Sequence, residues 1–234
     1  PHGCLEQTIS KAFPQLYLAK VMELPARTEQ QMRLHVETAL RRMGQFQRSD
    51  GGFNYWPGSG DHYDEWTSIY AGHFMVEAQR EGFVPTGNTL ANWIAYQRKS
   101  AREWHGTGPT GWSRQATQLA QAYRLYALAL AKQPELSAMN RLREQRDLSA
   151  MGRWMLAATY AIVGQTDAAK RLVEGVPATN AAYTEQGFTY GSDLRDDAII
   201  AEALMHLGET AKAAGVIQRI ARNLSADTWY STQT

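Results

Sequence analysis

Cysteine is almost absent from this sequence, in which Cys4 is the single cysteine among 234 residues. One thiol cannot form an intramolecular disulfide, and it is too little for the usual cysteine-rich zinc sites, so neither feature is expected. Charge of one sign is also lacking, because 24 Lys and Arg residues face 23 Asp and Glu residues. A net charge of +1, without a basic cluster, argues against nucleic acid or a charged membrane surface as a partner.

Long apolar runs are missing as well. A stretch such as residues 155–163 is far shorter than the roughly 20 residues that a transmembrane helix needs. The sequence begins at Pro1 and shows no signal-peptide pattern of a basic flank followed by an apolar core. We therefore expect a fragment of a larger multidomain protein, truncated at its C-terminus.

Helical periodicity is what the sequence does contain. Met32, Val36, Leu40 and Met43 form one apolar stripe at three- and four-residue steps, and no segment alternates as a strand would. The pattern predicts an all-α fold in a single domain, 1–234, with Pro14 bending or ending the first helix. Helices are predicted near 4–22, 29–47, 65–81, 87–102, 113–132, 137–145, 149–163, 166–174, 195–207 and 210–223.

The residues with the most distinctive chemistry lie at the start of the first predicted helix. Cys4 precedes Gln7 by three residues, and on a helix such a pair shares one face with Cβ atoms roughly 5–6 Å apart. At that separation the Cys4 sulfur can attack the side-chain carbonyl of Gln7, expel ammonia and close an internal thioester. A lone buried cysteine is usually inert packing, so the neighbouring residues must decide between the two interpretations.

These neighbours favour the thioester. The run Gly3-Cys4-Leu5-Glu6-Gln7 resembles the thioester motif of the α2-macroglobulin and complement family, and the leucine after the cysteine, with Pro1-His2 before Gly3, resembles its bacterial branch. The segments 46–53 and 66–67 resemble the turn and helix that follow in those domains. The resemblance implies an α/α toroid of antiparallel helix hairpins, shared in outline with terpenoid cyclases and protein prenyltransferases.

The resemblance also implies a function. A protease cleaves a bait region elsewhere in the full protein, the thioester becomes exposed, and a lysine of that protease attacks the Gln7 carbonyl. The expected product is a covalent amide at Gln7 and a free Cys4 thiol, so the protein acts once, as a protease inhibitor rather than an enzyme. Other domains of the parent protein are expected to shield the thioester from water. Bacterial relatives imply a periplasmic location, with the parent anchored to the inner membrane as a lipoprotein.

Gly3, Glu6 and His105 are the candidates for supporting roles. Gly3 either permits a tight bend before the helix or is an ordinary loop glycine. Glu6 either acts on the reacting groups or is a first-turn carboxylate that suits the helix dipole. His105 falls in the interval where some relatives carry an assisting histidine, yet its surroundings do not match, and alignment on Trp93 places that position nearer Ser113. We therefore expect no catalytic histidine and a thioester that prefers amines.

Two other functions compete with this interpretation. A toroidal isoprenoid-processing enzyme would need clustered aspartates, and Asp193, Asp196 and Asp197 are the candidates, although an acidic helix start explains them more simply. A helical-repeat binding module with an inert cysteine is the second alternative. No metal ion and no cofactor is expected for the thioester interpretation.

Overall fold

The computed structural model describes residues 3–58, 63–185 and 188–225, and its regular secondary structure is helical. Within these ranges the β-type pairings are isolated bridges, such as Gln47 with Phe53. The predicted all-α class is therefore confirmed. The residues fall into two units, Pro1–Lys99 and Ser100–Thr234, each with its own buried core.

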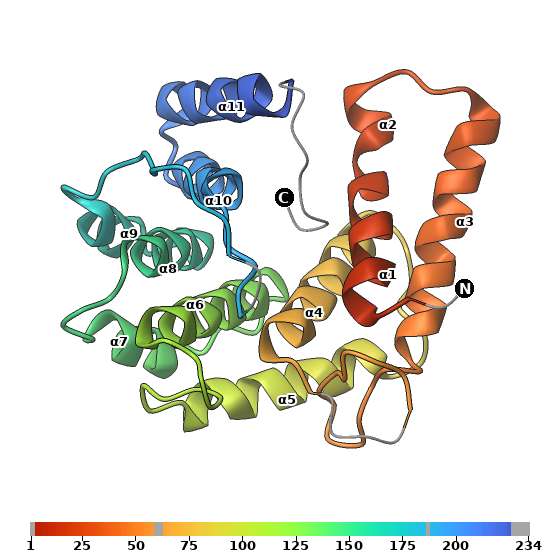
Figure 1. Cartoon of the computed structure of the whole chain (residues 1–234), viewed down its shortest axis with the longest axis horizontal. Helices are drawn as coiled ribbons and strands as arrows, with labels where there is room; N and C mark the ends of the chain where they lie inside the picture. Colours follow the sequence, from red (N-terminus) through yellow and green to blue (C-terminus); the bar gives the residue numbers. More distant parts are fainter. Residues whose placement is uncertain (1–2, 59–62, 186–187, 226–234) are drawn as a thin grey trace. The chain divides into compact units, whose positions relative to one another are not determined.

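The first unit carries the predicted reactive pair. Its helices are α1 (Leu5–Ala12), the 3₁₀ turn η1 (Phe13–Leu16), α2 (Leu18–Val21), α3 (Ala26–Met43), α4 (Glu65–Arg80) and the N-terminal part of α5 (Thr89–Glu103). α1 packs against both α3 and α4, and Figure 1 shows the red α1 running alongside the orange α3. The stripe of Val36, Leu40 and Met43 predicted for α3 is buried, as its periodicity requires.

Pro14 divides the first predicted helix. The α-helical hydrogen bonding of α1 stops at Ala12, and Pro14 lies in the 3₁₀ turn that follows, since proline cannot donate a backbone hydrogen bond inside a helix. The prediction of one helix over 4–22 is thus corrected to three short pieces, and the early end at Pro14 is confirmed. The predicted helix 29–47 instead spans Ala26–Met43, after which the chain turns.

α4 and α5 approach each other closely within the first unit. The indole of Trp93 is fully buried, and its Nε1 donates to the Ser68 carbonyl at 2.8 Å. A Cβ atom added at Gly72 would lie 1.8 Å from Cε2 of the same indole. Glycine is therefore required at this point, because any side chain would occupy the space that the indole fills.

The second unit continues the helical pattern. After the C-terminal part of α5 it contains α6 (Arg114–Leu130), α7 (Leu136–Arg143), α8 (Ala150–Ile162), α9 (Thr166–Val173), α10 (Asp193–His206) and α11 (Thr210–Leu224). α8 packs against α6, α9 and α10, and α10 packs against α11 (Figure 1). Gly164 and Gly208 follow α8 and α10 with φ of +80° and +76°, the left-handed conformation that ends many helices.

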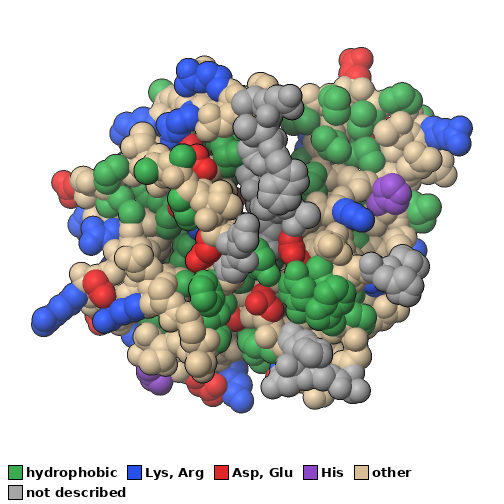
Figure 2. All heavy atoms as spheres, in the orientation of Figure 1, with side chains coloured by type: hydrophobic (Ala, Val, Ile, Leu, Met, Phe, Trp, Pro, Cys, Tyr) green, Lys and Arg blue, Asp and Glu red, His purple; other side chains and the backbone are tan. Residues whose placement is uncertain are grey.

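The surface agrees with the balanced composition. On the face drawn in Figure 2, Lys and Arg side chains are interspersed with Asp and Glu side chains. Among the described residues, no helix has the length and apolar character needed to cross a membrane.

Candidate functional site

Cys4 is the N-cap of α1. Its backbone is extended (φ −66°, ψ 172°), and its Sγ accepts a hydrogen bond from the backbone N–H of Gln7 at 3.4 Å. The thiol is 2% exposed, whereas the Gln7 side chain is at the surface. The structure therefore places the sulfur over the first turn, at the backbone N–H of the residue that carries the carboxamide. A negative charge on this sulfur would be stabilised by the Gln7 N–H and by the dipole of the helix start.

Two long-range contacts hold this turn. The Nη2 atom of Arg42, on α3, donates to the Gly3 carbonyl at 2.8 Å. On the other side of Cys4, the Leu5 N–H donates to the carbonyl of Tyr55 at 2.9 Å. The backbone before and after the thiol is thus fixed by two segments that are distant in the sequence.

Glu6 is buried rather than projecting into solvent. It is 6% exposed, and the hydroxyl of Tyr55 donates to its Oε2 at 2.8 Å. Burial raises the pKa of Asp64, and the negative charge of Glu6 raises it further. Burial likewise raises the pKa of Tyr70 to about 12, again with a contribution from Glu6. The charge of Glu6 therefore acts on both Asp64 and Tyr70. Its hydrogen bond with Tyr55 connects α1 to the loop before α4.

Gly3 has a steric requirement at this site. A Cβ atom added to it would lie 3.2 Å from Oε1 of Gln7, tighter than most contacts that Cβ atoms make, and 3.9 Å from Nη1 of Arg42. The absence of a side chain therefore leaves room for the Gln7 carboxamide. This requirement for space differs from the tight bend considered from the sequence.

The remaining candidates lie in the second unit. His105 is exposed in the loop after α5. Ser113, the position suggested by alignment, is the N-cap of α6, and its hydroxyl accepts from the N–H of Ala116 at 3.0 Å.

Two of the three candidate aspartates are engaged in ion pairs. Asp196 pairs with Arg195 at 2.6 Å, and Asp197 pairs with Arg219 at 2.7 Å. Asp193 is the first residue of α10, whose N-cap is Ser192. Within residues 3–58, 63–185 and 188–225, no group of three or more His, Cys, Asp or Glu side chains is arranged to hold a metal ion. The carboxylates of Asp196 and Asp197 are thus engaged by arginines of α10 and α11.

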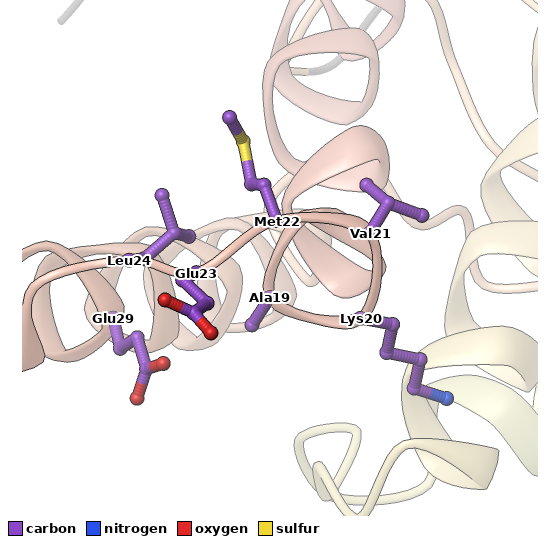
Figure 3. Close-up of a pocket in the computed structure, with 7 residues that line it drawn as sticks. All are labelled: Ala19, Lys20, Val21, Met22, Glu23, Leu24 and Glu29. Carbon is purple, nitrogen blue, oxygen red and sulfur yellow. The ribbon is translucent and has the colours of Figure 1, made fainter.

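A surface hollow lies at the turn between α2 and α3. Figure 3 shows its lining residues, with Val21 and Met22 projecting outward and the carboxylate-bearing side chains of Glu23 and Glu29 on one side of the turn. This lining includes neither Cys4 nor Gln7. The hollow is therefore separate from the predicted reactive pair.

Sequence reasoning missed both Arg42 and Tyr55. Arg42 is 39 residues from Gly3, and Tyr55 is 49 residues from Glu6. In the sequence, Arg42 is one of the basic residues in the last turn of an amphipathic helix. Tyr55 is part of a loop rich in glycine and aromatic residues. No local spacing links either residue to the first helix.

Comparison with known proteins gives this geometry a family context. No protein-family model matches the chain. Over 87% of its length the chain is 29% identical to alpha-2-macroglobulin of Escherichia coli K12, covering 13% of that protein. It is also 27% identical to alpha-2-macroglobulin of Xylella fastidiosa Temecula1 over the whole chain and 15% of that relative. The chain is thus similar in sequence to bacterial alpha-2-macroglobulins over most or all of its own length. It spans about one seventh of the length of these relatives.

Solved macroglobulin structures share the fold. Trypsin-activated alpha-2-macroglobulin from Escherichia coli matches the whole chain with a TM-score of 0.83 and 22% identity, over 16% of its own length. Salmonella alpha-2-macroglobulin reacted with methylamine gives a TM-score of 0.83 and 23% identity, again over the whole chain and 16% of its own length. The chain thus has the all-α fold of a corresponding part of bacterial alpha-2-macroglobulins.

Proposed function

We propose that this chain is the thioester domain of a bacterial alpha-2-macroglobulin, a single α/α toroid within a larger protein that inhibits proteases by covalent capture. The observation that supports it best is the Cys4 thiol at the start of α1, over the turn from which Gln7 projects. The similarity to bacterial alpha-2-macroglobulins also supports the proposal.

The chemistry needs two acyl transfers. In the first, Sγ of Cys4 attacks Cδ of Gln7, the C–N bond breaks, and ammonia leaves. In the second, an amine nitrogen attacks the same Cδ, the C–S bond breaks, and its electron pair goes to Sγ. The proton lost by the amine ends on the thiolate or on water, which leaves an amide at Gln7 and a thiol at Cys4. The acyl group is then spent, so the domain is an acyl donor used once and needs neither metal nor cofactor.

The partners follow from this chemistry. The structural relatives include Escherichia coli proteins described as activated by trypsin and by elastase, which supports proteases as targets. The neutral side-chain amine of a lysine on an attacking protease would supply the nucleophile after bait cleavage. Because water also attacks thioesters, the resting state requires cover from other domains of the parent protein. We place the parent in the periplasm, as an inner-membrane lipoprotein, with no direct membrane contact or nucleic-acid binding by this domain.

Intact-mass measurement of the full-length protein tests the proposal. The parent protein should be lighter than its sequence by one ammonia, and methylamine should add to Gln7 while releasing one titratable thiol. Cys4→Ser is the matched variant, because a serine hydroxyl can still accept the capping N–H of Gln7. It should fold normally, show no mass deficit and capture no protease. A parent with no mass deficit and a thiol that titrates at once would contradict the proposal.

A further inference from the structure

Arg42 is held next to the reactive turn by contacts on two sides. Its Nη2 donates to the Gly3 carbonyl at 2.8 Å, and its Cζ lies 5.6 Å from the ring centroid of the buried Phe46. The guanidinium is therefore confined between an aromatic ring and the backbone of the motif. A guanidinium keeps its positive charge at every pH at which the protein is folded.

The same charge lies near the oxygen that the chemistry would use. The vacant Cβ position of Gly3 is 3.2 Å from Oε1 of Gln7 and 3.9 Å from Nη1 of Arg42. Both atoms thus border the space left by the missing side chain of Gly3. The Gln7 Oε1 atom is the one that remains on the acyl carbon when ammonia leaves.

We propose that Arg42 is a positioning residue for acyl transfer at Gln7, fixing the Gly3–Cys4 turn and holding a permanent positive charge beside the acyl oxygen. This inference rests on the proposed thioester function. When an amine attacks Cδ, the C=O electron pair moves onto Oε1. As that oxygen re-forms the carbonyl, the C–S bond breaks and its pair passes to Sγ. Negative charge develops on both atoms in turn, and a fixed cation nearby stabilises it more in the transition state than in the resting thioester.

Glu6 cannot supply the stabilising positive charge, although it is closer to Gln7 in the sequence than Arg42 is. Its carboxylate is negative and engaged by the Tyr55 hydroxyl, so it would oppose charge growth on the acyl oxygen. The opposite sign of Arg42 is what suits the reaction. If Arg42 only held the backbone of Gly3, its replacement would affect folding. It would leave unchanged the rate at which an already formed thioester reacts with an amine.

The test compares Arg42→Gln, Arg42→Lys and Arg41→Gln in the full-length protein. Arg41 is an exposed neighbour that bonds Thr38 at 3.0 Å, so its variant controls for the loss of one positive charge. Thioester content is measured by intact mass, the rate of methylamine-driven thiol release is expressed per thioester, and thermal unfolding is followed in parallel.

Arg42→Gln should slow thiol release by about 10- to 100-fold, which is less than the roughly 100- to 1,000-fold typical for loss of a donor bonded directly to the oxyanion. Arg42→Lys should recover most of that loss, and Arg41→Gln should react as the parent does. The inference is overturned if Arg42→Gln reacts within about twofold of the parent, or if Lys and Gln lose rate equally along with unfolding temperature. A parent without any mass deficit is a separate result, because it removes the thioester itself and with it this role.

Discussion

The contact between Tyr55 and Glu6 gives a quantitative test of how the reactive turn is held. Tyr55→Phe removes a hydroxyl that donates to Oε2 of Glu6 at 2.8 Å, while the backbone bond from Leu5 N–H to the Tyr55 carbonyl can persist. A hydrogen bond to a charged group contributes about 1.5–3 kcal/mol. The upper part applies here, because the Glu6 carboxylate is 6% exposed and water cannot readily replace the hydroxyl.

We therefore expect Tyr55→Phe to lower the free energy of unfolding of the 234-residue chain by about 2–3 kcal/mol. Urea titration of the parent, Tyr55→Phe, Glu6→Gln and the double variant gives the coupling between the two side chains directly. A favourable coupling of at least about 1 kcal/mol is expected, since residues in direct contact typically couple by 0.5–3 kcal/mol. Additive single effects, with coupling under about 0.5 kcal/mol, would refute the reasoning.

The remaining predictions concern α4. Gly72→Ala should destabilise the chain by about 3 kcal/mol, because its new Cβ would lie 1.8 Å from Cε2 of the fully buried Trp93. Gly215→Ala is the control, because a Cβ atom added at this helical glycine would meet no neighbouring atom within 4 Å, and this substitution should be neutral or stabilising. If the two substitutions changed the unfolding temperature equally, the close packing of Gly72 against Trp93 would be contradicted. Burial raises the pKa of Asp64, so folding favours its protonated form and its contribution to stability falls as pH rises from the ordinary aspartate range through the raised pKa. Asp64→Asn keeps an acceptor for the Thr67 N–H but lacks the titrating carboxyl. The unfolding free energy of the variant minus that of the parent should therefore increase as pH rises through that window. A difference that stays constant with pH would count against the raised pKa of Asp64.

Local features of the fold could be predicted from the sequence, because they depend on neighbours within a few residues. The apolar stripe of α3 is buried as its spacing required, and Pro14 ended α1 for a covalent reason that no tertiary contact can override. Helix boundaries were predicted less accurately. The helix predicted over 195–207 begins at Asp193, after the N-cap Ser192, although its acidic start was predicted correctly. The pairing of Asp197 with Arg219 was not anticipated, since it joins separate helices.

The proposed reactive pair is the part of the candidate site that follows from the sequence, because three-residue spacing at a helix start fixes which residues share a turn. What surrounds that pair was decided by tertiary structure alone. The contacts of Arg42 with Gly3 and of Tyr55 with Glu6 join residues 39 and 49 positions apart, brought together by the packing of α1 against α3 and by the loop before α4. Periodicity says which face of a helix is buried. It does not say which polar residue of another segment will meet that helix, because that depends on how the packed helices place their ends.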